Sequence, residues 1–442
     1  MSDHTHTMAG PFGITLAQAQ QQLLDSLPTA ERTEQVALTD ALDRVLASDI
    51  YSPFPVPAAN NSAMDGFALR SDDVCPEHLG DTDTTKLQLW PVVGQSLAGH
   101  PFRGEVPVGA CIRITTGGVL PDALNTVVMQ EDVVRHHRAA SELTGNEQAE
   151  QMYISLSRAP TPGQFVRLRG SELSTGQAVL KQGTVLGPLQ LGLLATLGIA
   201  IVPVFAKIRV GVLSTGDELK QPGEALQPGD LYDSNRVVLR AVLTRLGATV
   251  TDFGWVADDP VAMRALFLQA ASTVDVLVCS GGVSVGDADH TRAVLAELGS
   301  IGFWQVAMKP GKPFAFGKIS DAAGQPCWFF GLPGNPVSAV VTCEQLLVPA
   351  LQRLQGQTVQ IPQLWPATAA SRFKKKPGRL DLQRAKLQVT AEGVTVSAVG
   401  LDSSAMLTSM LEGDALVHLE LPRGDVSCGE SVWLQPKSPW WR

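Results

Sequence analysis

Cysteine is scarce in this chain of 442 residues and never clustered. Its 6 cysteines stand singly and form no Cys-x-x-Cys pair, whereas a disulfide framework or a zinc site shows close, repeated spacing. The first residues, MSDHTHTMAGPFG, also lack the charged-then-apolar pattern of a secretion signal. We therefore expect a protein of a reducing compartment with a cytoplasmic location.

Positive charge is the second scarcity. Lysine and arginine number 34 against 43 aspartates and glutamates, which gives a net charge of −9, and the only dense basic run is Lys374-Lys375-Lys376. Non-specific nucleic-acid binding needs concentrated positive charge, so the composition argues against a nucleic-acid partner.

The stretch between Lys181 and Lys207 lacks charge altogether and is long enough to span a bilayer. Glycine and proline interrupt it, however. We interpret it as a helix that starts near Pro188 and ends at Gly198, followed by a buried strand over 199–205, and we expect no membrane span.

What the chain does contain is ample apolar sequence, 44% of residues against 17% charged, which is typical of a folded globular protein. At about 100–200 residues per domain, this length suggests several domains. Near the N-terminus, Thr15 and Gln18 resemble a capping box that begins a helix ended by Pro28, and residues 37–47 follow helical spacing again.

Farther along, the patterning changes twice. From residue 207, strands alternate with helices, and the near-continuous apolar run 274–279 is typical of a central parallel strand. We therefore expect an α/β multidomain protein built on an open parallel α/β sheet. The predicted parts are an elongated, discontinuous N-terminal α+β domain (1–58 with 150–206), a small irregular β module (59–149), the α/β domain (207–357) and a C-terminal β-barrel (358–442).

Polar, glycine-rich loops follow the predicted strands of the α/β domain. They are 214–218, 280–289 and 331–336, the last containing Pro333 and Asn335. Because ligands bind beyond the carboxyl ends of strands in open α/β sheets, these loops predict one binding site.

The loop 280–289 is the most informative of these. Gly281 and Gly282 let backbone amides approach an anion, and the next helix begins just beyond. Asp287 and Asp289 supply the oxygen ligands that Mg²⁺ prefers. The loop predicts a magnesium–phosphate site, and the alternative is a tight turn that merely requires glycine.

Other polar positions keep two interpretations. Glu218 with Asp217 could cap a helix or lie in solvent, and Asp258 with Asp259 could serve as an N-cap before Pro260. Lys309 and Lys312 form a Pro/Gly loop suited to an anion, or a solvated loop. Asp65 before Gly66, and the segment RITTGG at 113–118, predict ordinary turns when taken alone.

Seven segments occur in one order over most of the chain: NNSAMDGFALR, RITTGG, VLSTGDEL, DSNR, CSGGVSVGDAD, KPGKPFAFGK and GLPGNPVSAVVT. Together they closely resemble the molybdopterin molybdenumtransferase family, which is related to the C-terminal domain of gephyrin. The resemblance extends from about residue 12 to 435. It implies transfer of molybdenum from molybdate to adenylyl-molybdopterin with Mg²⁺-dependent release of AMP. It also implies a homodimer whose active-site cleft is shared between subunits.

The resemblance also assigns site residues. The implied catalytic residues are Asp65, Thr116, Glu218, Asp258 and Asp289, and the implied metal ligands are Asp287, Asp289 and Glu218. The implied substrate-binding residues are Gly281, Gly282, Ser284, Gly286, Lys309, Lys312, Pro333, Asn335, Arg379, Ser403 and Ser404.

This chain departs from the family pattern at three positions. Gln305 stands where several members carry a lysine, Glu172 where an aspartate is common, and Phe67 where a tyrosine is frequent. The first departure puts one anion contact in doubt, whereas the metal-site carboxylates are all retained.

Two rival functions fit parts of the chain. An adenylyltransferase acting one step earlier resembles the α/β domain alone, and a gephyrin-like protein could serve as a non-catalytic scaffold or cofactor-binding protein. Contacts with the adenylyltransferase and with apo-molybdoenzymes are further expectations. The sequence does not separate molybdate from tungstate, nor the roles of Asp258, Asp287 and Asp289.

Overall fold

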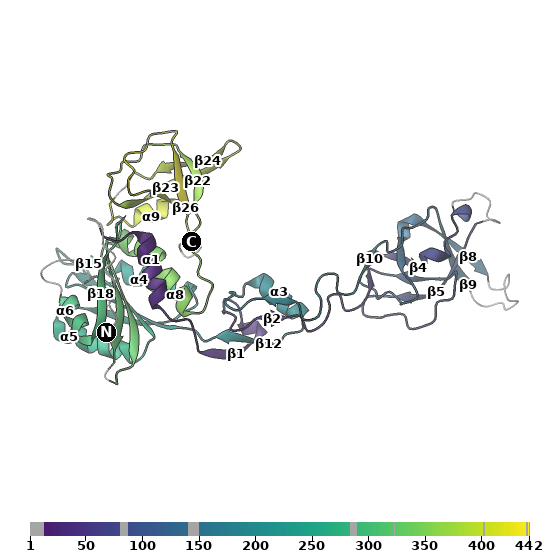
Figure 1. Cartoon of the computed structure of the whole chain (residues 1–442), viewed down its shortest axis with the longest axis horizontal. Coiled ribbons are helices and arrows are strands. Elements are labelled where there is room, and N and C mark those ends of the chain that lie inside the picture. Colours follow the sequence, from purple (N-terminus) through teal and green to yellow (C-terminus); the bar gives the residue numbers. More distant parts are fainter. Residues whose placement is uncertain are drawn as a thin grey trace. The chain divides into compact units, whose positions relative to one another are not determined.

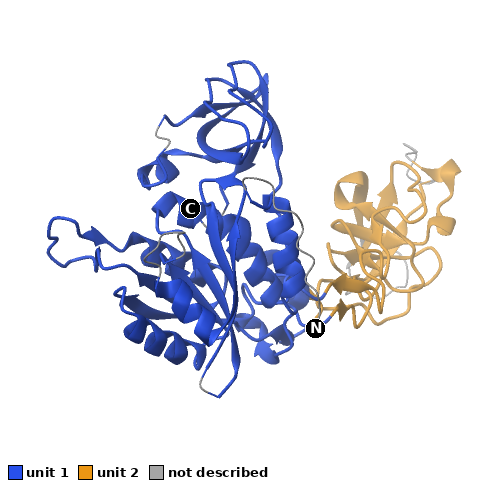
Figure 2. Cartoon of the chain, turned by 60° about the vertical axis from the view of Figure 1, so that its left-hand side comes forward, with its two compact units in different colours: residues 1–48, 182–195, 199–442 blue, residues 49–181, 196–198 orange. Residues whose placement is uncertain are grey.

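The computed structural model describes residues 13–79, 87–139, 150–282, 290–321, 323–400, 403–438 and 441. The chain divides into two compact units, coloured separately in Figure 2. The smaller unit comprises residues 49–181 with 196–198, and the larger one contains the rest of the chain. The four-part division expected from the sequence stays a prediction.

The smaller unit is an irregular β structure, as predicted. Its main sheet has the order β7-β4-β6-β5-β9-β8. These strands are β4 (Gly66–Leu69), β5 (Trp90–Ser96), β6 (Cys111–Ile114), β7 (Thr126–Met129), β8 (Val133–Ala139) and β9 (Glu150–Leu156). Two short pairs accompany it, β2 (Ile50–Tyr51) with β11 (Ala178–Leu180) and β3 (Asn61–Ser62) with β10 (Val166–Arg167). Short 3₁₀ turns connect the strands: η2 (Ser71–Asp73), η3 (Pro76–His78) and η4 (Gln130–Asp132).

The first helix of the larger unit, α1 (Leu16–Ser26), begins at the predicted capping box. The Gln18 amide donates to Thr15 Oγ1 at 3.2 Å, and the Thr15 amide donates back to Gln18 Oε1 at 2.9 Å. Farther on, α3 (Pro188–Thr196) and β12 (Ile201–Phe205) confirm the interpretation of the uncharged stretch. Among the described residues, no helix combines the length and the apolar character that crossing a membrane requires.

The predicted helix over 37–47 is wrong. The segment contains only the 3₁₀ turn η1 (Leu38–Asp40), which follows β1 (Thr33–Ala37), the partner of β12. Asp43 has a positive φ of 59°, which no α-helix accommodates, and its amide donates to the Leu186 carbonyl. Val45 and Leu46, which contribute to the apolar spacing, are buried because each forms an isolated β-bridge, with Val185 and Val204 respectively, and not because the segment is a helix.

The predicted α/β sheet has six strands. In spatial order they are β16 (Thr249–Val256), β13 (Arg209–Thr215), β17 (Val276–Ser280), β21 (Pro326–Leu332), β20 (Pro313–Ser320) and β18 (Gly299–Gln305). The first four run parallel, whereas β20 and β18 extend the sheet as an antiparallel pair. The sheet is therefore parallel at its centre and mixed at one edge.

Helices cover both faces of this sheet (Figure 1). The hydrophobic cluster on one face includes residues of α1, α4 (Ser234–Arg245) and α8 (Val348–Leu354). The cluster on the other face includes residues of α5 (Pro260–Ala271) and α6 (His290–Leu298). The helix α7 (Pro336–Thr342) follows β21 and continues through a π turn, η5 (Cys343–Leu347), into α8. The carboxyl ends of the parallel strands stay uncovered by these helices.

The predicted C-terminal β-barrel is present. The ring runs β23-β24-β22-β26-β25 and closes because β25 also pairs with β23. Its elements are β22 (Trp365–Ala369), β23 (Leu380–Thr390), β24 (Gly393–Ala398), α9 (Thr408–Glu412), β25 (Ala415–Leu419) and β26 (Ser431–Pro436). The short strand β19 (Met308–Lys309) of the α/β region pairs with β23, where Met308 faces Leu380. This pairing places the lysine loop beside the barrel.

Candidate functional site

A cavity of about 750 Å³, the main cavity, lies at the carboxyl ends of β13, β17 and β21. The start of β20 and the short parallel pair of β14 (Leu219–Lys220) with β15 (Leu231–Tyr232) also line this cavity. Of the residues predicted from the sequence, it is lined by Glu218, Asp258, Gly281, Gly282, Pro333 and Asn335. The strand-end loops therefore do converge on one space.

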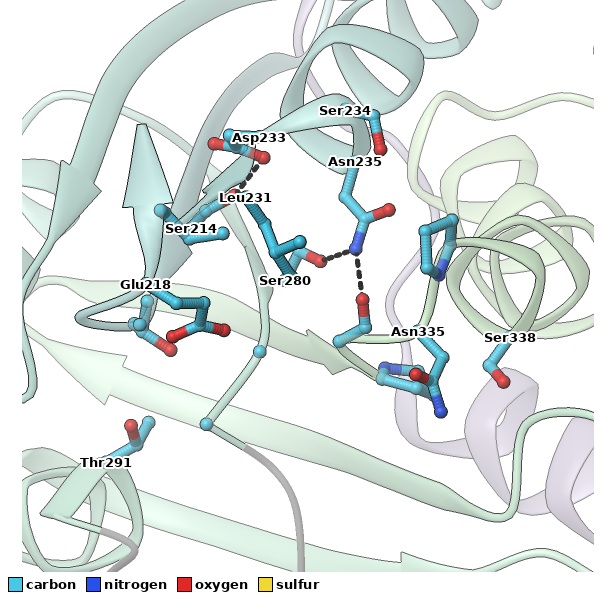
Figure 3. A pocket seen from close by; sticks show the side chains of 18 of the residues that line it. Ser214, Glu218, Leu231, Asp233, Ser234, Asn235, Ser280, Thr291, Asn335 and Ser338 are labelled. Carbon is cyan, nitrogen blue, oxygen red and sulfur yellow. Dashed lines mark hydrogen bonds between the residues drawn. The ribbon is translucent and has the colours of Figure 1, made fainter. Parts of the chain in front are cut away.

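Asn235, at the start of α4, joins two of these loops. Its Nδ2 donates to Ser280 Oγ at 2.8 Å and to the Gly334 carbonyl at 2.7 Å. Figure 3 shows the amide between β17 and the loop after β21, with Glu218 and Thr291 on one side of the pocket and Asn335 and Ser338 on the other. The side chain thus holds the two strand ends at a fixed separation.

Gly281 and Gly282 occupy a backbone conformation that other residues rarely adopt. Their φ angles are +91° and +63°. A Cβ on Gly281 would lie 2.5 Å from the Thr215 carbonyl oxygen, and one on Gly282 would lie 2.2 Å from Thr291 Oγ1. The glycines are therefore required for close packing, and that packing leaves their backbone on the cavity wall.

The acidic residues lie on the rim. Asp259, not Asp258, caps α5, because its carboxylate accepts from the amides of Val261 and Ala262 at 3.1 and 3.4 Å. Asp217 Oδ1 accepts from the Asp258 amide at 3.0 Å. Partial desolvation, followed by the charges of Asp217 and Glu218, raises the pKa of Asp258, while His290 opposes the shift. The Asp258 carboxyl therefore lies on the cavity wall, where Asp217 and Glu218 add further negative charge nearby.

The predicted metal ligands are only partly in view. Ser284, Gly286, Asp287 and Asp289 lie outside the described residues. Within the described ranges, no three His, Cys, Asp or Glu side chains come close enough together to hold a metal ion. Glu218, which lines the main cavity, is the predicted ligand that the structure does place.

The lysine loop borders a second cavity of about 240 Å³, the inner cavity. Lys309, Lys312, Arg379 and Ser404 line it, and it shares Pro313, Asn335 and Ser338 with the main cavity. Lys309 Nζ lies 3.7 Å from Asp381 Oδ2. Lys312 is exposed and makes no ion pair with any described residue. With Arg384, four cationic side chains therefore line one space next to the main cavity.

Ser403 does not line either cavity as described. Its carbonyl accepts a hydrogen bond from Arg384 Nη2 at 3.4 Å, and its hydroxyl accepts from the Ala405 amide at 3.3 Å. Asn335 occupies the N-cap position of α7, but its side chain makes no capping hydrogen bond there. The Asn335 side chain is exposed at the junction of the two cavities.

Asp65 and Thr116 meet each other in the smaller unit. Asp65 Oδ1 accepts from the Thr116 amide at 2.6 Å and from Thr116 Oγ1 at 2.9 Å. These bonds, the backbone one first, lower the pKa of Asp65 although the carboxyl is fully exposed. The turn interpretation of this segment therefore holds locally, with an ionised carboxylate at its surface.

Sequence reasoning missed several residues around the main cavity: Asn235, His290, Thr291 and Ser338. Thr215 was predicted only as part of the loop 214–218. Asn235 lies in the DSNR segment at 233–236, which was noted only for its resemblance. Thr215 Oγ1 is buried and has no hydrogen-bond partner among the described residues. An orphaned hydroxyl of this kind becomes visible only once the strand ends are packed.

Comparison with known proteins decides the family. Three family models match the chain: the MoeA N-terminal region (domain I and II) over 14–198, a probable molybdopterin binding domain over 211–353, and the MoeA C-terminal region (domain IV) over 366–437. A molybdopterin molybdenumtransferase of Haemophilus influenzae is 42% identical over 425 residues, which cover 96% of this chain and 98% of the relative. The chain belongs to the molybdopterin molybdenumtransferase family.

Other relatives agree with this membership. A molybdopterin molybdenumtransferase of Synechococcus elongatus is 36% identical over 90% of this chain and 93% of its own. The crystal structure of a molybdopterin biosynthesis protein from Pyrococcus horikoshii superimposes with a TM-score of 0.78 at 25% identity, covering 96% of this chain and 100% of that one. The prediction of a transferase of molybdenum-cofactor biosynthesis is confirmed.

Proposed function

We propose that this chain transfers molybdenum from molybdate to adenylyl-molybdopterin and releases AMP. The observation that carries the proposal is that two cavities of opposite charge lie next to each other and share lining residues. The main cavity has glycine backbone and carboxylates, the inner cavity has cationic side chains, and Asn335 and Ser338 belong to both. The main cavity can therefore bind a pyrophosphate-linked nucleotide, and the neighbouring inner cavity can bind a tetrahedral dianion.

The glycine loop suits the phosphates of the substrate. Gly281 and Gly282 have no side chains to hinder the approach of an anion, and they lie on the cavity wall beside Ser280. We place the pyrophosphate of adenylyl-molybdopterin there, and we extend the site to Ser284 and Gly286 of the same loop.

The acidic rim suits Mg²⁺. Glu218 and Asp258 offer carboxylate oxygens, the donor type that this ion prefers, and the negative charges of Asp217 and Glu218 beside Asp258 favour a cation there. We propose that Glu218 holds the ion together with Asp287 and Asp289. When bound, Mg²⁺ neutralises charge on the phosphates.

The chain's own residues then position the reactants. Lys309, Lys312 and Arg379 hold the molybdate dianion, and Asn335 orients the substrate between the cavities. If water attacks the adenylyl phosphorus, the phosphoanhydride bond breaks, AMP departs with the new oxygen, and the other phosphate stays on the pterin. If a molybdate oxygen attacks instead, the same bond breaks and the adenylyl group passes to molybdate, and water must then cleave this adenylyl–molybdate anhydride to release AMP. Neither route requires a protein nucleophile. The buried hydroxyl of Thr215 lies beside the glycine loop, so we do not assign it that role.

We further propose a cytoplasmic homodimer in which Asp65 and Thr116 of one subunit complete the cleft of its partner. The exposed, ionised Asp65 carboxylate supports this role, because its fixed geometry suits a contact outside its own module. Contacts with the adenylyltransferase that supplies the substrate, and with apo-molybdoenzymes that receive the cofactor, belong to the same proposal.

Neighbouring aspartates provide a matched test. Asp258→Asn should lower molybdate-dependent AMP release about 100-fold, since it removes charge from the cavity rim. Asp259→Asn removes the same charge one residue away and keeps a good helix cap, so its rate should stay near that of the wild type. AMP release is measured from adenylyl-molybdopterin with Mg²⁺ and molybdate. Equal rates in the two variants would contradict the assignment of Asp258.

A further inference from the structure

A third cavity, the outer cavity, lies between Lys309, Arg379 and the basic run 374–376, with a volume of about 370 Å³. Five basic side chains and two aspartates line it. This concentration of positive charge stands out because the whole chain has a net charge of −9. The proposed function has used only Lys309 and Arg379 of this set.

The two aspartates are already engaged. Asp425 pairs with Arg372, and its Oδ1 accepts from the Lys375 amide at 2.7 Å. Asp381 lies 3.7 Å from Lys309 and accepts from Gln383 Nε2 at 3.0 Å. Both carboxylates therefore have hydrogen-bond or ion-pair partners other than Lys374 and Lys376, although the charge of Lys374 also helps to lower the pKa of Asp425 after its bonds to Lys375 and Arg372.

Lys375 is the structural member of the run. It is buried, and its Nζ donates to the carbonyls of Lys376, Leu421 and Arg423 at 3.3, 3.5 and 3.0 Å. These bonds, together with the amide bond to Asp425, fix the backbone of the run. The lysines on either side are consequently held at the cavity although both are exposed.

Lys374, Lys376 and Arg379 supply the unpaired charge. None of the three forms an ion pair with another described residue, and all three line the outer cavity. A group of cations that form no ion pair with the described residues, in a hollow of a protein with net negative charge, concentrates anions by focusing the electric field. Arginine in particular presents a planar fork of donors that fits tetrahedral oxyanions.

The outer cavity lies next to the inner one. Lys309 and Arg379 line both, so their side chains form a shared wall. Lys374 and Lys376 line only the outer cavity, and Lys312 lines only the inner one.

We propose that the outer cavity is a second oxyanion site, which takes tetrahedral dianions of the molybdate class and passes them to the inner cavity. The transfer step rests on the proposed function, whereas the binding itself does not. The site raises the local concentration of a scarce dianion that the net charge of the protein would otherwise repel.

Equilibrium binding of molybdate to the full chain at low ionic strength tests the site without any turnover. The wild type should bind two dianions, and the double variant Lys374→Gln/Lys376→Gln should lose one and keep the other. Lys312→Gln should show the opposite loss. Lys386→Gln, an exposed lysine of β23 outside the three cavities, should retain both.

Molybdenum anomalous scattering from crystals soaked in molybdate should place one peak beside Lys374 and Lys376. A single peak confined to the inner cavity, or two sites in the double variant, would overturn the proposal. Binding of AMP but not of molybdate at the site that the double variant removes would overturn it as well.

Kinetics separate this proposal from the proposed function. The double variant should raise the KM for molybdate about tenfold, change kcat less, and lose this difference at high salt, since screened charges no longer concentrate the dianion. If no AMP is released by any variant, the proposed function fails while the binding result still decides the outer site. An unchanged KM at low salt would contradict the passage of molybdate through the outer cavity.

Discussion

At the scale of single residues, the site divides into groups that the sequence could reveal and groups that it could not. Glu218 follows a strand of the predicted parallel sheet, so strand-end geometry was enough to predict its place at the cavity. Asp258 lines the same cavity, but the sequence alone also allowed an N-cap, and only the family resemblance assigned it to the site. Asn235 was not foreseeable in this way, because its two hydrogen bonds depend on how closely β17 and the loop after β21 approach. The choice of Asp259 as the cap also needed coordinates.

The raised pKa of Asp258 gives a prediction on pH. Desolvation, Asp217 and Glu218 favour the protonated form, so the ionised form is lost at a higher pH than for an ordinary aspartate. If ionised Asp258 is needed, kcat/KM should fall on acidification, and Asp217→Asn should move that fall to lower pH because it removes a neighbouring negative charge. Asp122→Asn, in the smaller unit, should leave the profile unmoved. If the pH profile of kcat/KM of Asp217→Asn coincides with that of the wild type, Asp258 is not the group whose ionisation controls the reaction.

At the scale of elements, the sequence predicted a helix correctly where residues within or next to the helix mark its ends. The capping box gave α1, and proline and glycine bounded α3. The segment 37–47 failed because its apolar residues are buried by long-range bridges such as Leu46 with Val204. The strand β20 was also missed, since Pro313 and Gly317 weaken the strand signal that the sheet context overrides.

Gly192 tests the helix α3. It lies within the helix, and a Cβ there would meet no atom within 4 Å. Gly192→Ala should therefore raise the free energy of unfolding by about 0.5–1 kcal/mol, mainly by restricting the unfolded chain. Gly198→Ala is the control: it has equal space but a φ of +68°, so it should be destabilising. Denaturant unfolding of both variants measures the difference, and a destabilised Gly192→Ala variant would speak against the helix.

At the scale of the whole larger unit, the end of the chain ties the barrel to the α/β region. Glu344 of η5 is buried, and its carboxylate accepts from Gln435 Nε2 at 2.9 Å, from Ser438 Oγ, and from Trp441 Nε1 at 2.8 Å. Burial raises the pKa of Glu344 despite these donors. Its partners lie so far along the chain that no sequence pattern could have indicated them, whereas the existence of the barrel was predictable from its short strands.

Removing one hydrogen-bond donor to Glu344 should show how much this contact contributes to the free energy of unfolding. Trp441→Phe leaves Glu344 Oε2 without its donor and should lower the free energy of unfolding by about 1–3 kcal/mol. Trp433→Phe, on the exposed side of β26, should change it by less than about 0.5 kcal/mol. Denaturant unfolding of both variants provides the comparison. Equal losses would show that aromatic packing, and not the hydrogen bond, stabilises this end of the chain.

The central claim is that one chain brings a nucleotide site and an oxyanion site together for a single reaction. The most direct measurement is AMP release from adenylyl-molybdopterin and Mg²⁺ with and without molybdate, using the wild type and Lys312→Gln. The account predicts release that requires molybdate and that weakens in the variant until more molybdate is supplied. Release that is equally fast without molybdate, or tight substrate binding with no release in its presence, would contradict it.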